Sequence, residues 1–486
     1  MKQSIPIVAG DCPVTGEDSL PFDLSTVDAG STAWVLASAA LVLIMTPGLA
    51  FFYGGMVRSK NVLGMLMQNF ATIGIVSVVW VLVSYSLAFG GSNAYLGGFH
   101  FAGLKNMDQV VPGYTGSFAQ VIPPIVFVGF QLMFAVITPA LITGGTADRW
   151  KFPAFVTFVV IWSIVVYAPV AHWVFSPTGW LFKRGALDFA GGTVVHANAG
   201  IAALAVVLVL GKRRGWPRER FRPHNVPFVM LGCALLWFGW FGFNAGSALG
   251  ANSLAGYAFV NTNTATAAAL LAWILVEKIR DGKPTTLGAA SGAVAGLVAI
   301  TPAAGFVTPM GSVAIGLIAG AICCLCVGLK FRFKFDDSLD VVAVHLVGGI
   351  SGALLIGFFA DKSVNPLGAD GVFTGGGWSQ LGKQALAVAA VVGYSFIATL
   401  IIALVLNVVF RKMRMTDDAQ LEGMDSVLHG ETAYEFGPSL GSAVGTLTGA
   451  GSIPSSVGSS ATHPSIPASG MPIDGATVSN KTGVDA

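Results

Sequence analysis

The chain has 486 residues, of which 54% are apolar and only 10% are charged, and its net charge is +2. A soluble domain of ordinary composition is about one quarter charged, so water is not the main solvent of this chain. The low net charge and the scattered Lys and Arg residues argue against a nucleic-acid partner.

The first 33 residues are polar and lack the basic start and apolar core of a cleaved signal peptide, so we expect an external segment over 1–33. After it, apolar residues fall into runs of roughly twenty, which as helices cross about 30 Å of hydrocarbon. These runs predict an all-α integral membrane protein whose membrane domain, 34–410, has eleven transmembrane helices, at 34–56, 65–89, 121–144, 153–174, 190–211, 226–248, 256–276, 285–303, 311–329, 341–360 and 384–410.

Lys and Arg residues concentrate in the odd-numbered connections between these runs. The third connection alone holds Lys212, Arg213, Arg214, Arg218, Arg220 and Arg222, and the chain after the last run opens with Arg411, Lys412 and Arg414. Cytoplasmic loops of membrane proteins are enriched in these residues. We therefore expect the N-terminus outside the membrane and the C-terminus in the cytoplasm.

The last part of the chain changes composition. Residues 411–436 are mixed and polar, and we expect a cytoplasmic tail there. Residues 437–486 are rich in Gly, Ser and Pro with few large apolar side chains, which is typical of a disordered segment.

Cysteine usage and catalytic motifs give no sign of metal or enzyme chemistry. Cys323, Cys324 and Cys326 resemble a metal cluster only at first sight, because small thiols are ordinary packing residues on a membrane helix. A Walker A loop, an HExxH motif and a GxSxG elbow are absent from the sequence. We therefore expect no metal or other cofactor and no enzyme activity.

A short pattern occurs twice, about 150 residues apart. His196 follows Asp188 by eight residues, and His345 follows Asp337 by eight, while Gly and Ile stand four and five residues after each histidine. The two copies fall in the fifth and tenth runs. Because five is odd, the second copy enters the membrane from the opposite side, which predicts a five-plus-five inverted repeat with a solute site at the repeat interface.

Histidine is costly in a membrane helix, so it usually faces the interior of a bundle or a cavity. His196 and His345 are expected to meet near the repeat axis, where each imidazole bonds the other through one nitrogen and offers its second nitrogen to a solute or a proton. The alternative is that both rings only pack helices together, bonded to backbone carbonyls. Asp188 is explained by capping of the following helix, or by a fixed charge at an outer vestibule.

Aromatic residues on two of the runs are candidates for lining a pore. Phe130, Phe134 and Phe243 have rings that can stabilise a cation and exclude wide hydrated ions. From the sequence alone, packing in the protein core is the better explanation of each of these three residues.

Four segments carry a resemblance to a known family: 45–55 (MTPGLAFFYGG), 188–196 (DFAGGTVVH), 240–247 (WFGFNAGS) and 429–434 (HGETAY). Together they resemble the ammonium transporter family, the Amt/Mep/Rh group, in its bacterial Amt type, from about residue 33 to 436. The resemblance implies a homotrimer in the cell membrane, each subunit of which takes ammonium from an external vestibule and passes ammonia through an apolar pore while the proton travels separately.

The resemblance also implies residue roles. Phe134 and Phe243 are similar to the stacked outer gate, Ser247 to a hydrogen-bonding member of the ammonium site, and Asp188 to its supporting acid, while His196 and His345 are similar to the paired pore histidines. In the tail, Asp425, His429, Gly430 and Glu431 resemble a regulatory segment, which in relatives can respond to a PII-type protein.

One position departs from the family pattern. After His172 the chain reads Trp-Val-Phe, so Phe175 stands where the family usually has tryptophan. Phenylalanine lacks the indole N–H and has a weaker ring quadrupole, which predicts weaker ammonium recruitment unless Trp173 or Trp180 compensates. Two other functions fit the same motifs: an ammonium sensor and a neutral gas channel of the Rh type.

Overall fold

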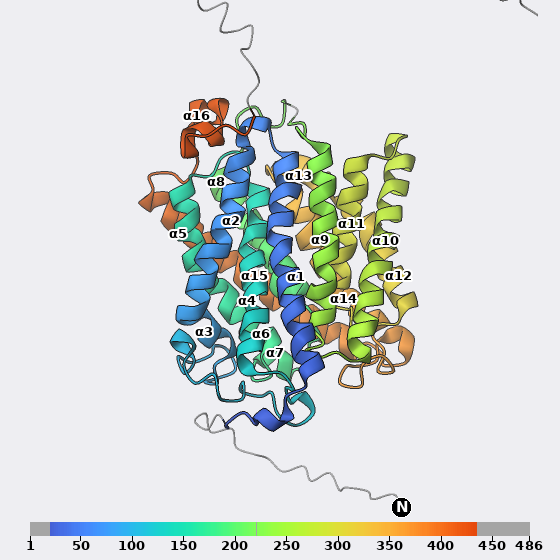
Figure 1. The fold of residues 1–486 in the computed structure, drawn as a ribbon. Helices are drawn as coiled ribbons and strands as arrows, with labels where there is room; N and C mark the ends of the chain where they lie inside the picture. The colour runs from blue at the N-terminus through green and yellow to red at the C-terminus, as the bar shows by residue number, and fades with distance from the viewer. Residues whose placement is uncertain (1–19, 220, 435–486) are drawn as a thin grey trace, which may run out of the picture. The chain divides into compact units, whose positions relative to one another are not determined.

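The computed structural model describes residues 20–219 and 221–434. In this part every regular element is a helix, and the β structure consists of three isolated bridges. Figure 1 shows the long helices running roughly side by side, with α3, α6 and α7 at one end and α16 at the other. The expected disordered segment 437–486 and residues 1–19 of the expected external segment lie outside the described residues.

The α-helices are α1 (Ala29–Met56), α2 (Val62–Val79), α3 (Tyr85–Phe89), α4 (Pro124–Thr146), α5 (Phe152–Trp162), α6 (Ala168–Phe175), α7 (Trp180–Lys183), α8 (Asn198–Leu210), α9 (Val226–Gly246), α10 (Ser253–Asp281), α11 (Thr286–Ile300), α12 (Pro309–Cys326), α13 (Leu329–Phe333), α14 (Gly348–Phe359), α15 (Ser379–Val409) and α16 (Asp417–Glu422). Five π-helical turns join or extend them: η3 (Trp80–Ser84), η6 (Ser163–Tyr167), η7 (Gly192–Ala197), η8 (Val342–Val347) and η10 (Asp425–His429). Short 3₁₀ turns are η1 (Leu24–Thr26), η2 (Ser59–Asn61), η4 (Ala102–Leu104), η5 (Gly116–Phe118) and η9 (Val372–Thr374).

Ten helical segments of the described residues are long and apolar enough to cross a membrane. They coincide with ten of the eleven predicted runs, so the all-α membrane class holds. The run expected at 285–303 is α11, which has 15 residues and is about 22 Å long, shorter than a full crossing. It begins where the Thr285 side chain accepts the Gly288 amide at 2.8 Å.

Helix starts follow local capping rather than the apolar runs alone. The first long helix begins at Ala29, five residues before the expected 34, because the Asp28 carboxylate accepts the Ser31 amide at 2.6 Å. A capping carboxylate satisfies a backbone donor that the helix itself leaves unpaired. The helix α1 is therefore more than one turn longer at its start than the predicted span 34–56, and the predicted apolar part lies within it.

Glycine spacing brings α1 and α9 into close contact. On α9, Gly232, Gly239, Gly242 and Gly246 face α1, and a Cβ atom on Gly232 would lie 2.3 Å from the backbone nitrogen of Phe52. Helices in lipid associate through such small residues, which let the backbones approach. This contact fixes the end of α9, and with it Phe243 and Ser247, against the first helix.

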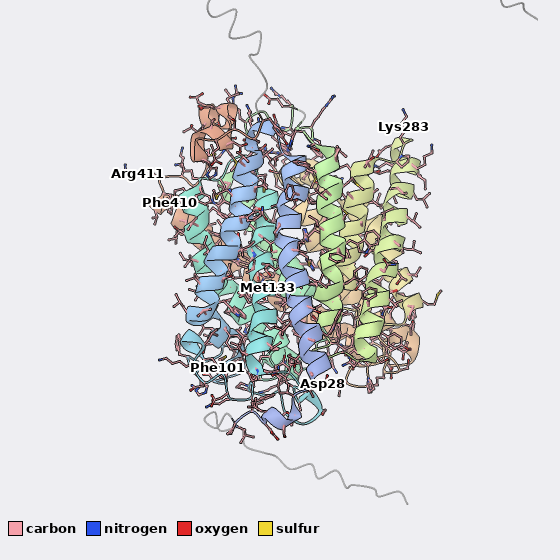
Figure 2. All side chains as sticks on the ribbon, in the orientation of Figure 1. Asp28, Phe101, Met133, Lys283, Phe410 and Arg411 are labelled. Atoms are coloured by element: carbon pink, nitrogen blue, oxygen red, sulfur yellow. The ribbon has the colours of Figure 1, made fainter. Side chains whose placement is uncertain are left out.

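Basic residues mark one end of the bundle. Figure 2 shows Lys283 and Arg411 at the end opposite to Asp28 and Phe101. The helix α16, in the segment that follows α15, lies at the same end of the bundle as Arg411 (Figures 1 and 2).

Candidate functional site

The two histidines of the repeat meet in the interior of the bundle. His196 lies on η7 and His345 on η8, and their Nδ1 atoms are 3.3 Å apart. The rings are nearly parallel, at an angle of 21°, and the residues are 1% and 2% exposed. Both stand on π-helical turns, which are frequent at functional sites.

Two aromatic residues complete the surroundings of the histidine pair. The Trp240 ring stacks on His196 with a centroid distance of 5.3 Å, and its indole N–H donates to the Thr301 hydroxyl at 2.8 Å. The Tyr53 hydroxyl lies 3.4 Å from Nε2 of His345. Nε2 of His196 has no hydrogen-bond partner among the described residues, so one ring nitrogen of the pair is not used by the fold.

The two repeat segments make the same contact on each other. A Cβ atom on Gly200 would lie 2.4 Å from the backbone nitrogen of Leu346, and one on Gly349 would lie 2.8 Å from the backbone nitrogen of Ala197. Each glycine therefore packs against the residue that follows the other segment's histidine. Such reciprocal contacts are typical of a local two-fold relation, and they hold the imidazoles at their short separation.

The acids of the repeat cap the two π turns in the same way. Asp188 accepts the Gly192 and Thr193 amides at 2.7 and 2.8 Å, and Asp337 accepts the Val341 and Val342 amides at 3.2 and 2.7 Å. Asp188 also accepts the Thr193 hydroxyl. Since its oxygens are largely occupied by backbone donors, its first role is to start the His196 turn.

A stacked pair of phenylalanines lies next to the histidines. The Phe134 and Phe243 rings are 4.2 Å apart at an angle of 25°, and the residues are 1% and 0% exposed. Phe243 is 6.1 Å from the His196 ring, measured between centroids. Phe130 packs edge to face on Phe134 and does not line the cavity described below, so it belongs to the support of this stack.

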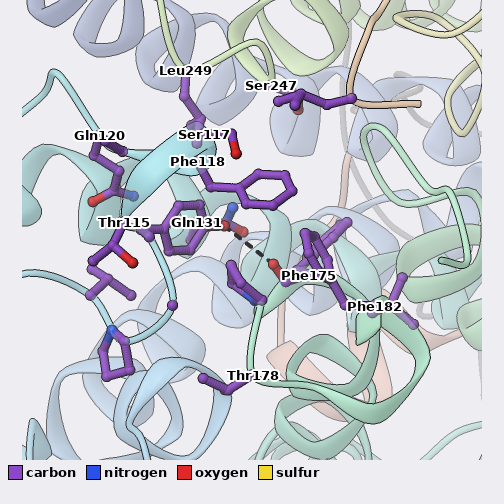
Figure 3. A pocket seen from close by; sticks show the side chains of 18 of the residues that line it. Thr115, Ser117, Phe118, Gln120, Gln131, Phe175, Thr178, Phe182, Ser247 and Leu249 are labelled. Atoms are coloured by element: carbon purple, nitrogen blue, oxygen red, sulfur yellow. Dashed lines mark hydrogen bonds between the residues drawn. The ribbon is translucent and has the colours of Figure 1, made fainter. Parts of the chain in front are cut away.

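A cavity of 1530 Å³ opens on the other side of the phenylalanine stack. Its lining includes Phe134, Phe175, Asp188 and Ser247, whereas Phe243 and both histidines are absent from it. Figure 3 shows Phe175, Ser247 and Gln131 around this cavity. The Ser247 hydroxyl donates to the Phe243 carbonyl at 2.8 Å, which leaves its oxygen able to accept a bond from a solute.

Phe175 stands at the cavity wall with its ring edge on Phe134. The centroids are 6.2 Å apart at 88°, and Phe175 is 9% exposed. Trp173 and Trp180, the expected substitutes for the missing tryptophan, are both absent from the cavity lining, so the structure gives no support to their compensating for it. The Trp173 indole donates instead to the Tyr95 carbonyl at 2.7 Å.

A buried ion-pair cluster lies at the basic end of the bundle. Asp336 bonds Arg213 at 2.8 Å and lies 3.9 Å from Arg149, while Asp148 lies 3.3 Å from Arg58 and 3.8 Å from Arg213. Burial alone would raise the pKa of the Asp336 carboxyl, but the hydrogen bonds and charge of Arg213 outweigh it and hold this pKa below its usual range. Burial lowers the pKa of Arg149 to about 10, so it stays charged at neutral pH.

The tail residues dock beside this cluster. The Asp425 carboxylate accepts the Gly64 amide at 2.8 Å at the start of α2, and burial raises the pKa of this carboxyl. His429 packs edge to face on Phe152 with a centroid distance of 5.2 Å. Gly430 follows with a φ of 66°, which favours glycine, and the Glu431 amide donates to the Asp425 carbonyl at 3.1 Å, so these four residues form one folded turn.

Residues 20–219 and 221–434 contain no group of three or more potential metal ligands. Cys323 and Cys324 are buried on α12, where they pack with neighbouring helices. Tyr53 and Trp240 are the site residues to which sequence reasoning gave no role. Both lie inside the motifs quoted above, but the ring each one contacts follows only from the three-dimensional arrangement.

Comparison with known proteins places the chain among transporters. The sequence model of the Ammonium Transporter Family matches residues 33–434. An ammonium transporter of Mycobacterium tuberculosis is 51% identical over 450 residues, covering 87% of this chain and 94% of the relative. One of Bacillus subtilis is 50% identical over 408 residues, covering 84% and 98%.

Solved structures agree with this placement. Candida albicans Mep2 superposes with a TM-score of 0.75 at 37% identity, covering 82% of this chain and 89% of that chain. A structure titled "Sensor Amt Protein" has a TM-score of 0.74 at 31% identity, covering 82% and 97%. The family match and the two relatives at half identity confirm the resemblance seen in the sequence: the chain belongs to the Ammonium Transporter Family.

Proposed function

We propose that this protein recruits ammonium in the cavity, removes a proton there, and conducts ammonia past the phenylalanine stack and the histidine pair, with net movement of charge. One observation carries the proposal: the stack of Phe134 and Phe243 separates an open cavity from two buried histidines in mutual contact. A hydrated cation does not pass two rings 4.2 Å apart without their displacement. A small neutral molecule needs far less desolvation to do so.

The cavity side suits a cation. Phe175 and Phe134 present aromatic surface, which attracts an ammonium ion through the ring quadrupole. Ser247 adds a hydroxyl oxygen that accepts an N–H bond. Transfer of the proton from this point to the histidine route described next turns a well-held cation into a weakly held neutral solute, which favours onward movement.

The histidine pair suits transfer of a proton from ring to ring. If the Tyr53 hydroxyl donates to Nε2 of His345, then Nδ1–H of His345 donates to Nδ1 of His196. Nε2 of His196 then carries a hydrogen. If Tyr53 donates instead to the Leu141 carbonyl, which is 3.3 Å away, the order of donors reverses. The two arrangements differ by one proton shift through both rings.

In the membrane we propose eleven spans, ten long segments plus α11, arranged as a five-plus-five inverted repeat. The reciprocal glycine contacts and the matching caps of the π turns support the repeat. The position of Lys283 and Arg411 at the end opposite to Asp28, together with the basic residues of the odd-numbered connections, supports an external N-terminus and a cytoplasmic C-terminus in the cell membrane. Family membership supports a homotrimer.

The docked tail is proposed as a regulatory element. Asp425, His429, Gly430 and Glu431 form its turn, and the Asn61 side chain links the adjacent Met424 amide to Asp148 of the charged cluster. From there Arg213 leads to Asp336, next to the Asp337 that caps the His345 turn. A PII-type protein that lifts the tail would act on this path.

The test is the current evoked by an ammonium pulse on reconstituted proteoliposomes, with ammonia flux followed by internal pH. The proposal predicts a current in the wild type that falls strongly in His196→Asn and His345→Asn. A flux without current would favour the neutral gas channel, and the absence of both in folded protein would favour the sensor, which the likeness to the Sensor Amt Protein supports. A current that ignores both substitutions would refute the proton route.

A further inference from the structure

Two glutamines at the cavity wall have amide atoms without partners. Gln120 and Gln131 both line the cavity and are 8% and 7% exposed. Both amide atoms of Gln120, and Oε1 of Gln131, have no hydrogen bond within the described part of the chain. Figure 3 shows both side chains among those that surround the cavity.

Unpaired buried amides are costly, and a glutamine elsewhere in this protein avoids the cost. Gln384 on α15 is 1% exposed, yet its oxygen accepts the Leu187 amide at 2.7 Å and its nitrogen donates to the Leu187 and Ala353 carbonyls at 2.7 and 3.0 Å. Native proteins satisfy most buried polar groups with protein or water partners, and Gln120 and Gln131 differ from other unpaired amides in lining a cavity. The missing partner of Gln120 and Gln131 is therefore expected to come from the cavity they face.

Their positions define a track toward the phenylalanine stack. Gln131 lies on α4, which starts at Pro124, so it stands three residues, about 4.5 Å of rise, outward of Phe134. Gln120 lies in the connection just before this helix. A solute entering the cavity can meet the two amides before it reaches the ring of Phe134.

The two carboxylates on the same wall are already engaged. The Asp188 carboxylate accepts four backbone amides, among them Gly192 and Thr193, and the Asp28 carboxylate accepts the Ser31 amide. The two glutamines therefore offer acceptors that the fold does not already use. The terminal torsion of glutamine is broad, so either amide can turn its oxygen toward the cavity at small cost.

We propose that Gln120 and Gln131 form an amide-lined station for ammonium, outward of Phe134, Phe175 and Ser247. Ammonium has four N–H donors, and neutral amide oxygens replace part of its hydration while releasing it readily. Hydrated ammonium is handed inward from the station to the aromatic site. This inference rests on the proposed transport function and adds a binding step to it.

The test uses Gln120→Met, Gln131→Met and the double variant, which keep side-chain length and remove the amide. Each single variant is expected to raise the half-saturation concentration of the ammonium-evoked current about three- to ten-fold, as for the loss of one hydrogen bond. The maximal current should stay within about two-fold, because the step after Phe134 is untouched. Gln131→Glu keeps an acceptor and adds charge, so it should lower the half-saturation concentration.

Gln68→Met is the matched control. Gln68 on α2 is 1% exposed and both of its amide atoms lack partners too, but it does not line the cavity. An unchanged half-saturation in the Gln120 and Gln131 variants, or an equal shift in Gln68→Met, would overturn the station and leave transport standing. A wild type without current would instead overturn the proposed function.

Discussion

Replacement of Phe175 by tryptophan tests how the cavity holds its cation. Phe175 lines the cavity, is 9% exposed and meets Phe134 edge to face at 6.2 Å, so a larger ring at this position extends into the 1530 Å³ space rather than into the core. Cation–π attraction at partly exposed sites is about 0.5–1 kcal/mol, and tryptophan is the strongest partner. If the gain from Phe to Trp is of that size, ammonium affinity rises about two- to five-fold.

The assay is the half-saturation concentration of the ammonium-evoked current, measured on Phe175→Trp and wild type in the same liposomes. We expect the half-saturation concentration to fall by that factor while the maximal current changes little. Phe182→Trp is the control, since Phe182 lines the same cavity but packs edge to face on Phe118 at 5.3 Å. An unchanged value in Phe175→Trp, or the same decrease in Phe182→Trp, would refute the role given to this ring.

Three further predictions concern the frame around the pore. Gly200→Ala should lower the free energy of unfolding by about 1–3 kcal/mol and reduce the current, because the new Cβ would lie 2.4 Å from the backbone of the opposing π turn. Gly393→Ala is the control: it has no atom within 4 Å of its Cβ position, so it should be neutral or stabilising. Thermal unfolding in detergent compares the two variants, and equal effects would contradict the packing argument. Asp336→Asn should cost about 3–5 kcal/mol at neutral pH by leaving buried Arg213 short of its partner. The pKa of Asp336 is lower in the folded protein than in the unfolded chain, where it is about 3.9, so the ion pair stabilises the fold above that pH and stops doing so as pH falls through the folded pKa. The difference in unfolding free energy between wild type and Asp336→Asn should therefore shrink below about pH 4. A difference that stays constant with pH would count against this assignment. Asp425→Ala should speed amide hydrogen exchange in residues 411–434 and leave exchange in the membrane helices unchanged, because it removes the hydrogen bond from the tail to the start of α2. Unaltered exchange in the tail would show that this bond does not hold it in place.

Much of the helical frame was predictable because membrane spans leave long apolar runs. The ends were less so, because they depend on single caps such as Asp28, which starts α1 at Ala29. The short length of α11 was also not predictable from the sequence. The apolar run at 285–303 continues past the end of the helix into turns that include Pro302, which has no backbone N–H to donate to a helix.

The sequence predicted which residues of the site lie together, but it did not predict how they are arranged. The repeat predicted that His196 and His345 meet, yet it contained nothing about their π turns or about Trp240 stacking on the ring. Gln131 left a visible signal, a polar residue inside an apolar run beside two phenylalanines. The missing hydrogen bond of its side-chain oxygen depends on the three-dimensional packing, so the sequence pattern alone could not predict it.

The reciprocal contacts of Gly200 and Gly349 have a consequence for how this sequence can change over time. A larger residue at either position would clash with the segment that carries the histidine of the other half. Substitutions in the two halves are therefore coupled at this contact. Effects of paired substitutions there should depart from additivity, as expected for residues in one packed contact. This contact should therefore vary slowly while the lipid-facing residues around it are replaced freely.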